Sequence, residues 1–181
     1  MKQALSSEAQ NRLRIAGWYP GRVADLTHAR KILTGLGISM TENAEELLLE
    51  LYGLEVTRAY GYEPTKFWYG GAMVLIESRH LSVLRALAGE PVCPIIGATC
   101  GVLCLGESGT VHAIDLNWCC FGISPSLDDL LCERKTGKTF IFNEVQLEIL
   151  CDEHSDIQSI CDMIVVRQKP FDLFDVYSMP W

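Results

Sequence analysis

The sequence lacks an apolar stretch long enough to cross a membrane. Its longest apolar run, residues 93–106, is shorter than the roughly 20 residues of a spanning helix, and Pro94, Gly97 and Gly101 interrupt it. The first residues, MKQALS, contain no apolar segment of the kind that secretory signal peptides carry. Together these absences predict a cytoplasmic protein whose eight cysteines stay reduced and form no disulfides.

Lysine and arginine are scarce in the second half of the chain. Residues 1–90 contain ten Lys or Arg and ten Asp or Glu, whereas residues 91–181 contain five and thirteen, so the whole net charge of −8 lies after residue 90. This balance disfavours direct binding of nucleic acid, because contacts with phosphates need cations. It favours a basic protein partner, although a solvated acidic face that aids solubility is an equal alternative.

Catalytic motifs are also missing. The segment Thr136-Gly137-Lys138-Thr139 resembles the end of a phosphate-binding loop, but Cys132 stands where the first glycine of that loop belongs. Neither the Gly-x-Ser-x-Gly turn of hydrolases nor the zinc-deaminase pattern occurs. His112 lies near Asp115, but a hydrogen-bonded strand histidine explains it better than a catalytic base. We therefore expect no catalytic residue and no enzyme activity, with an enzyme of unrecognised class as an alternative.

Metal binding has little support in the cysteine spacing. Adjacent cysteines in a strand point to opposite faces, and structural zinc sites pair two knuckles of similar spacing. We therefore expect neither a metal nor a cofactor. The nearest candidates are Cys100 with Cys104, Cys119 with Cys120, and Cys151 with His154.

The first third of the chain predicts three amphipathic helices, at residues 8–16, 26–36 and 42–52. Apolar residues recur at helical spacing in each, and a glycine follows each of them. Ser7 with Gln10 matches a capping box for the first helix, and Thr41 is a candidate cap for the third.

Strands dominate after residue 53. Alternating or apolar runs predict strands at 54–59, 67–76 and 118–123, and a hairpin of residues 102–105 and 110–116 around Glu107-Ser108-Gly109. Two further helices are expected, at residues 81–89 and from Ser124-Pro125 to 134, the second with proline at its first helical position. Residues 140–150 fit a strand or a helix, residues 157–166 a helix, and the aromatic tail 171–181 should pack on the domain or on a partner.

The most specific feature is the run Ala16-Gly17-Trp18-Tyr19-Pro20-Gly21-Arg22. Gly17 suits the left-handed conformation that closes many helices. Trp18 has a large apolar body to bury and an indole N–H that needs a partner. Pro20-Gly21 fits a type II turn.

This run resembles the N-terminal motif of one branch of the SUKH superfamily, bacterial immunity proteins that neutralise polymorphic toxins. Similar pieces follow in the family's order over residues 7–134, and the resemblance implies an α+β fold in which N-terminal helices and a later helix pack on a curved, mostly antiparallel sheet. Residues 1–135 would form the SUKH-like domain, with residues 136–181 as a C-terminal extension packed on it. The pieces are residues 47–54, Pro94-Ile95-Ile96-Gly97, Gly109-Thr110-Val111-His112 and Phe121-Gly122-Ile123-Ser124, followed by the helix at 127–131.

The same resemblance implies a function without catalysis. Such proteins bind a toxin encoded beside them, commonly a nuclease or a nucleic-acid deaminase, and block it. A regulatory scaffold like the fungal cell-wall synthesis regulators of the same superfamily is the alternative. We expect the motif residues to shape a corner of the fold: Gly17, Trp18, Pro20, Gly21 and Arg22. The best-placed acidic cluster after residue 90, and so the candidate contact with a basic toxin, is Asp128, Asp129 and Glu133.

Overall fold

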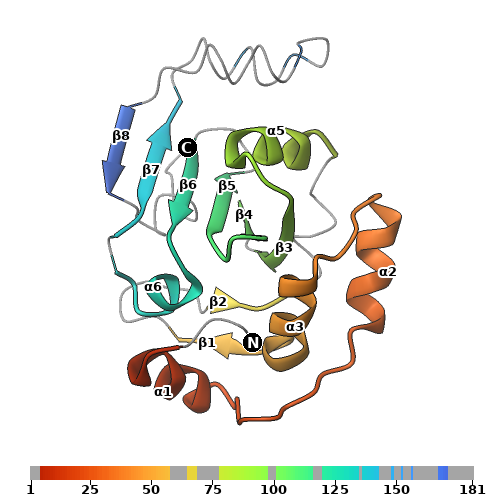
Figure 1. The fold of residues 1–181 in the computed structure, drawn as a ribbon, viewed down its shortest axis with the longest axis vertical. Coiled ribbons are helices and arrows are strands. Elements are labelled where there is room, and N and C mark those ends of the chain that lie inside the picture. The colour runs from red at the N-terminus through yellow and green to blue at the C-terminus, as the bar shows by residue number, and fades with distance from the viewer. Residues whose placement is uncertain are drawn as a thin grey trace.

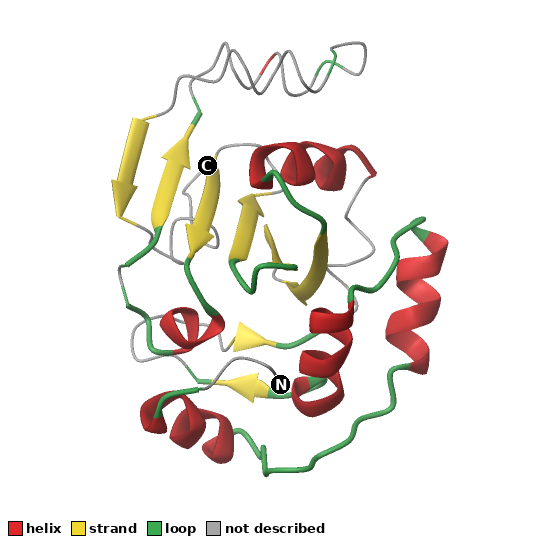
Figure 2. Ribbon diagram, viewed as in Figure 1, coloured by secondary structure: helices red, strands yellow, loops and turns green. Residues whose placement is uncertain are grey.

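The computed structural model describes residues 5–57, 65–68, 78–97, 101–115, 120–134, 136–142, 148, 152, 156 and 167–170. It shows an α+β fold, with helices arranged around an antiparallel sheet (Figures 1 and 2). The helices are α1 (Ser7–Ile15), α2 (Thr27–Gly35), α3 (Glu42–Leu51), α5 (Ser78–Ala88) and α6 (Leu127–Leu131). The strands are β1 (Glu55–Val56), β2 (Thr65–Lys66), β3 (Val92–Gly97), β4 (Gly101–Gly106), β5 (Val111–Asp115), β6 (Cys120–Ser124), β7 (Lys138–Ile141) and β8 (Arg167–Pro170).

The first helices begin at side-chain caps. Thr41 caps α3 as expected, since its hydroxyl accepts the N–H of Ala44 at 3.4 Å. The expected capping box of Ser7 with Gln10 is wrong by one residue at the cap. The hydroxyl of Ser6 accepts the N–H of Ala9 at 3.3 Å, and the Gln10 side chain donates to a backbone carbonyl, that of Leu5.

Helix α6 also begins later than expected. Ser126 is its N-cap and accepts the N–H of Asp129 at 3.0 Å, so Pro125 precedes the cap instead of taking the first helical position. The helix ends at Leu131, not near residue 134, because Glu133 adopts a positive φ of 54° that α-helical backbone does not allow.

The large sheet has a simple topology. Strands β3 to β8 lie side by side in sequence order, each antiparallel to its neighbours, and the sheet does not close. Strands β4 and β5 form the expected hairpin, with Leu103 opposite Ala113. A register shift between Pro94 and Ile96 marks an irregularity where β3 pairs with β4, of the kind that bends a sheet. Strands β7 and β8, from the last quarter of the chain, extend this same sheet.

Helices cover this sheet and enclose the core. Helices α3 and α5 both contact β3, α3 also contacts β4, and α5 contacts β5. Helix α6 packs on β6, and α1 packs on α6. Every residue of β3 and β4 is buried, so both faces of these strands are covered and their sequences lack the polar–apolar alternation of a half-exposed strand. The largest side chains of the core include Phe67, Leu48, Leu51, Ile95 and Leu103.

Several sequence predictions concern residues that the structure does not describe. The helix at 157–166, the tail 171–181 and most of the strand at 67–76 lie outside the described residues.

The short β1–β2 ladder is joined to the large sheet by a bridge between Phe67 and Ile96. None of the helices in the described part of the chain has the length and apolar character that a membrane crossing requires.

Candidate functional site

The run from Ala16 to Arg22 begins by closing helix α1. Gly17 has a φ of 96°, and its N–H bonds to the carbonyl of Arg14 at 3.0 Å. The N–H of Trp18 reaches back to the carbonyl of Leu13 at 2.9 Å. These two bonds form a Schellman motif, which satisfies carbonyls that a helix end otherwise leaves open.

A tight turn follows immediately. The N–H of Arg22 bonds to the carbonyl of Tyr19 at 3.1 Å, and Gly21 at the third position has a φ of 81°. Positive φ at this position, after a proline, is the geometry of a type II turn. The two motifs together end α1 and turn the chain within a few residues.

Trp18 and Arg22 attach this corner to the end of helix α3. The Trp18 side chain is only 8% exposed, and its indole N–H donates to a carboxylate oxygen of Glu50 at 3.0 Å. The guanidinium of Arg22 donates to the carbonyls of Glu50 and Tyr52, the latter at 2.8 Å. These are carbonyls at the C-terminal end of α3, where a positive charge also complements the helix dipole. The polar groups of the motif thus point into the protein.

The same corner leaves three large apolar side chains in solvent. Ile15 is 75% exposed, Tyr19 60% and Val23 78%. We call these three residues the corner patch. Beside them, the exposed Arg14 lies over the Trp18 ring, 5.8 Å from its centroid, and donates to the side chain of Gln10. The sequence analysis missed the patch. Its only local signal is that Ile15 lies off the buried face of α1.

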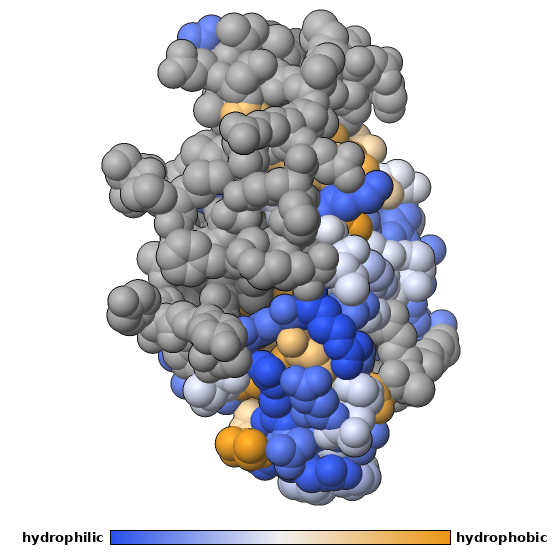
Figure 3. All heavy atoms as spheres, turned by 90° about the vertical axis from the view of Figure 1, so that its left-hand side faces the viewer, coloured by the Kyte–Doolittle hydropathy of each residue, from blue (hydrophilic) through white to orange (hydrophobic). Residues whose placement is uncertain are grey.

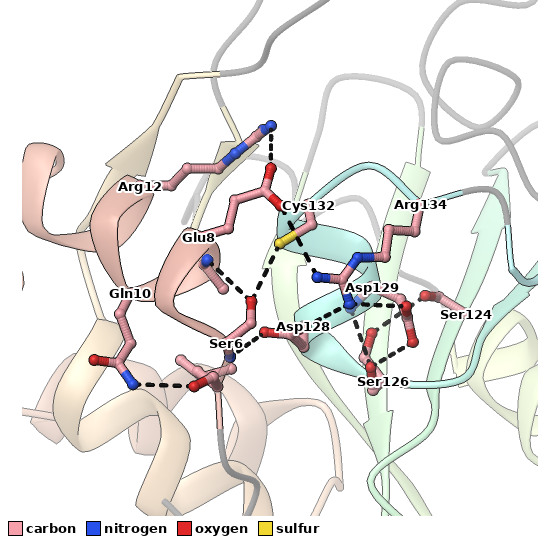
Figure 4. A network of polar contacts seen from close by, with 12 residues as sticks. Ser6, Glu8, Gln10, Arg12, Ser124, Ser126, Asp128, Asp129, Cys132 and Arg134 are labelled. Carbon is pink, nitrogen blue, oxygen red and sulfur yellow. Dashed lines mark hydrogen bonds and ion pairs between the residues drawn. The ribbon is translucent and has the colours of Figure 1, made fainter.

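The acidic candidates Asp128 and Asp129 lie in a network that joins α6 to α1 (Figure 4). Glu133 joins the same network through its ion pair with Arg12. One carboxylate oxygen of Asp128 accepts the backbone N–H of Ser6 at 2.7 Å, and the other accepts from Arg134 at 2.8 Å. Burial opposes ionisation of this carboxyl, but the bonds from Ser6 and the charge of Arg134 hold its pKa below the ordinary value.

The other two acids also have internal partners. Asp129 accepts from the hydroxyl of Ser126 at 2.7 Å and lies 3.5 Å from Arg134, while Glu133 pairs with Arg12 at 3.3 Å. Figure 3 shows the side of the molecule on which α1 and α6 lie in Figure 1, and hydrophilic residues gather over its lower part. Each of these three carboxylates thus has an arginine partner. The network keeps a net negative charge, because two arginines, Arg12 and Arg134, face four carboxylates when Glu8 is included.

A second polar cluster joins the start of β3 to the β4–β5 hairpin. One carboxylate oxygen of Glu90 lies 2.9 Å from Nε2 of His112 and 2.8 Å from the hydroxyl of Ser108, and the other accepts the N–H of Ser108 at 2.7 Å. A Cβ on Gly106 would lie 2.3 Å from this carboxylate, so the site needs glycine for space. Burial raises the pKa of the Glu90 carboxyl, but the hydrogen bonds from His112 and Ser108 lower it by more. The carboxyl therefore stays ionised.

This arrangement is not a catalytic triad. The carboxylate stands between the hydroxyl and the imidazole, so Ser108 donates to Glu90, whose lowered pKa makes it a weak base, and not to His112. His112 is a hydrogen-bonded strand histidine, as expected: it lies in β5 and bonds to Glu90, and its ring stacks on Phe121 with centroids 6.1 Å apart. A hollow of about 630 Å³ lies beside the cluster, with Arg85, Glu90 and Glu107 among its walls.

The remaining sequence candidates that lie among the described residues form no metal or phosphate site. Within the described ranges, no three His, Cys, Asp or Glu residues lie close enough to hold a metal ion. Cys93, Cys104 and Cys132 are buried free thiols, and burial raises the pKa of Cys93 to about 11, which makes it unreactive at neutral pH. Lys138 and Thr139 stand in strand β7 and not before a helix, so this segment is no phosphate-binding loop. Cys100, Cys119, Cys151 and His154 lie outside the described residues.

Comparisons with family models, curated proteins and solved structures give no match. The case for a function therefore rests on the geometry above and on the resemblance of the sequence motifs.

Proposed function

We propose that the protein is a SUKH-type immunity protein, which binds a cognate toxin in the bacterial cytoplasm and blocks it without catalysis. The observation that supports this proposal best is the corner at residues 16–22. Its Trp18 and Arg22 bond to the end of α3, in an α+β fold of the kind that the motif resemblance implies. A nuclease or a nucleic-acid deaminase is the toxin class that the resemblance favours.

The polar chemistry of the described residues suits a binding protein. Glu90 and His112 join the hairpin to the start of β3, and Asp128 joins α6 to the start of α1 through the N–H of Ser6. Buried thiols with raised pKa values are poor nucleophiles. The Glu90–His112 and Ser6–Asp128 contacts thus hold elements of the fold together.

Net charge supports a basic partner. The excess of −8 lies wholly after residue 90, and a protein that acts on nucleic acid tends to be basic because it must bind phosphates. A negative field accelerates encounter with such a partner. Since Asp128, Asp129 and Glu133 are each engaged by an arginine, we assign this attraction to the whole acidic half of the chain.

Co-expression tests the proposal. The toxin domain encoded by the gene beside this one should arrest bacterial growth by itself, and this protein should restore growth and co-purify with the toxin as a stoichiometric complex. A protein that neither protects the cells nor binds the purified toxin would refute the immunity function and leave the scaffold alternative.

A further inference from the structure

Exposed large apolar side chains are concentrated in one short segment of the described chain. They are Ile15, Tyr19 and Val23, which lie within nine consecutive residues at the corner. Single exposed apolar residues are ordinary, but a group of them on one surface is typical of a protein-binding site. Tyrosine is also among the residue types that dominate binding energy at interfaces.

The backbone under this corner patch is held from several directions. The Schellman motif fixes the end of α1 below Ile15, and the type II turn fixes Tyr19 relative to Arg22. Trp18 and Arg22 then tie the turn to α3. A patch that is already ordered loses little conformational entropy on binding, so more of its contact energy appears as affinity.

Charge at the border of the patch indicates what its partner presents. Arg14 is exposed, and within the described part of the chain its guanidinium donates one hydrogen bond, to Gln10, and has no carboxylate partner. The carboxylates near the corner have other partners. Asp25 accepts from the backbone and hydroxyl of Thr27, Glu8 pairs with Arg12, and Glu50 accepts from Trp18. A guanidinium with free N–H groups fits a carboxylate.

We propose that the corner patch, together with Arg14, is the surface that docks the cognate toxin, at an apolar hollow of the toxin bordered by an aspartate or glutamate. This inference rests on the proposed function. Two parts of the protein then have different roles in binding: the acidic half attracts a basic partner from a distance, and the corner patch makes the lasting contact. The first effect acts on the association rate and the second on the dissociation rate.

Calorimetry with the purified toxin domain of the neighbouring gene tests the patch. Tyr19→Ala should weaken binding by about thirtyfold and Val23→Asp by about a hundredfold, as hot-spot positions do. Thr34→Asp adds the same charge at an exposed position of α2 and should change affinity by no more than about twofold. All three variants should melt like the wild type, because the replaced side chains are in solvent.

A charge pair of variants tests Arg14. Arg14→Glu and Lys31→Glu make the same change of charge, but only Arg14 borders the patch. Arg14→Glu should weaken binding about tenfold or more, whereas Lys31→Glu, on exposed α2, should stay within about twofold. Arg14→Gln, which removes the positive charge without adding a negative one, should lie between the wild type and Arg14→Glu.

The possible failures are distinguishable. Wild-type protein that does not bind the toxin domain would overturn the immunity function and this inference together. A toxin that binds the wild type and every corner variant equally would overturn the docking surface and leave the function standing. Dimerisation of the protein without toxin, abolished by Val23→Asp in light scattering, would assign the patch to a second copy of the chain and overturn the inference as well.

Discussion

Trp18 stabilises the corner through both parts of its side chain. The ring is buried, and the indole N–H bonds to Glu50, which lies 32 positions further along the chain. A side chain with both properties contributes to the fold of the N-terminal half, whatever surface binds the partner.

Trp18→Ala should therefore lower the free energy of unfolding by about 3–5 kcal/mol, as truncation of a buried tryptophan does elsewhere. Urea or thermal unfolding measures this loss. Tyr19→Ala is the matched control, because the neighbouring tyrosine is exposed and its truncation should cost less than about 0.5 kcal/mol. Equal stability of Trp18→Ala and wild type would show that the corner is not structural.

The carboxylate of Glu90 occupies the space that a Cβ at position 106 would need. A Cβ at position 106 would push the Glu90 carboxylate away from Ser108 and His112. We expect Gly106→Ala to cost about 1–3 kcal/mol of stability in the wild type, the usual cost of leaving a buried polar group without its partner.

A double-mutant cycle separates this effect from a simple change of backbone. In a Glu90→Ala background no carboxylate stands in the way, so Gly106→Ala should then be nearly neutral. A cost of Gly106→Ala that is the same in both backgrounds would contradict the coupling.

At the scale of elements, the contact between α1 and α6 depends on an ionised carboxylate. Asp128 caps the chain before α1 by accepting the N–H of Ser6, and it pairs with Arg134 on its other oxygen (Figure 4). Reversing the charge at Asp128 would break both contacts and destabilise the fold, so such a variant would not isolate an effect on binding.

The pH dependence of stability reports this contact. The folded pKa of Asp128 lies below its reference value of 3.8, so the carboxylate contributes its stability fully above that value and loses it as the pH falls through the folded pKa. The stability difference between wild type and Asp128→Asn should be constant from about pH 5 to 7 and shrink below about pH 4. Chemical denaturation across this range measures it, and a difference that does not change with pH would contradict the assignment.

At the scale of the whole molecule, the uneven charge should govern how fast a partner arrives. Because screening acts on exposed charges, raising the ionic strength from about 50 to 300 mM should slow association with a basic toxin by about tenfold and leave dissociation nearly unchanged. Stopped-flow or surface-based kinetics measures both rates. Association that is indifferent to salt would indicate a partner without a basic surface.

Local signals in the sequence predicted most of the elements and part of the corner. Thr41 marks the start of α3, Gly17 ends α1, and the turn at residues 107–109 joins β4 to β5, because caps and turns involve atoms only a few residues apart. The same reasoning placed the N-cap of α1 at Ser7 and not at Ser6, because two successive serines offer equivalent caps.

Tertiary structure decided the rest. Three contacts follow from how distant or folded-back segments pack, and no local pattern encodes them. They are Trp18 with Glu50, His112 with Glu90, and Asp128 with Arg134. Exposure of a side chain such as Val23 likewise depends on what the finished fold leaves uncovered. The sequence by itself thus determined the helices, the hairpin and a corner motif, since these depend on short-range sterics and hydrogen bonds. Only packing across the chain decided that the acids at Asp128, Asp129 and Glu133 are paired with arginines while apolar side chains at the corner stay exposed, because long-range contacts determine which charges find partners and which surfaces are buried.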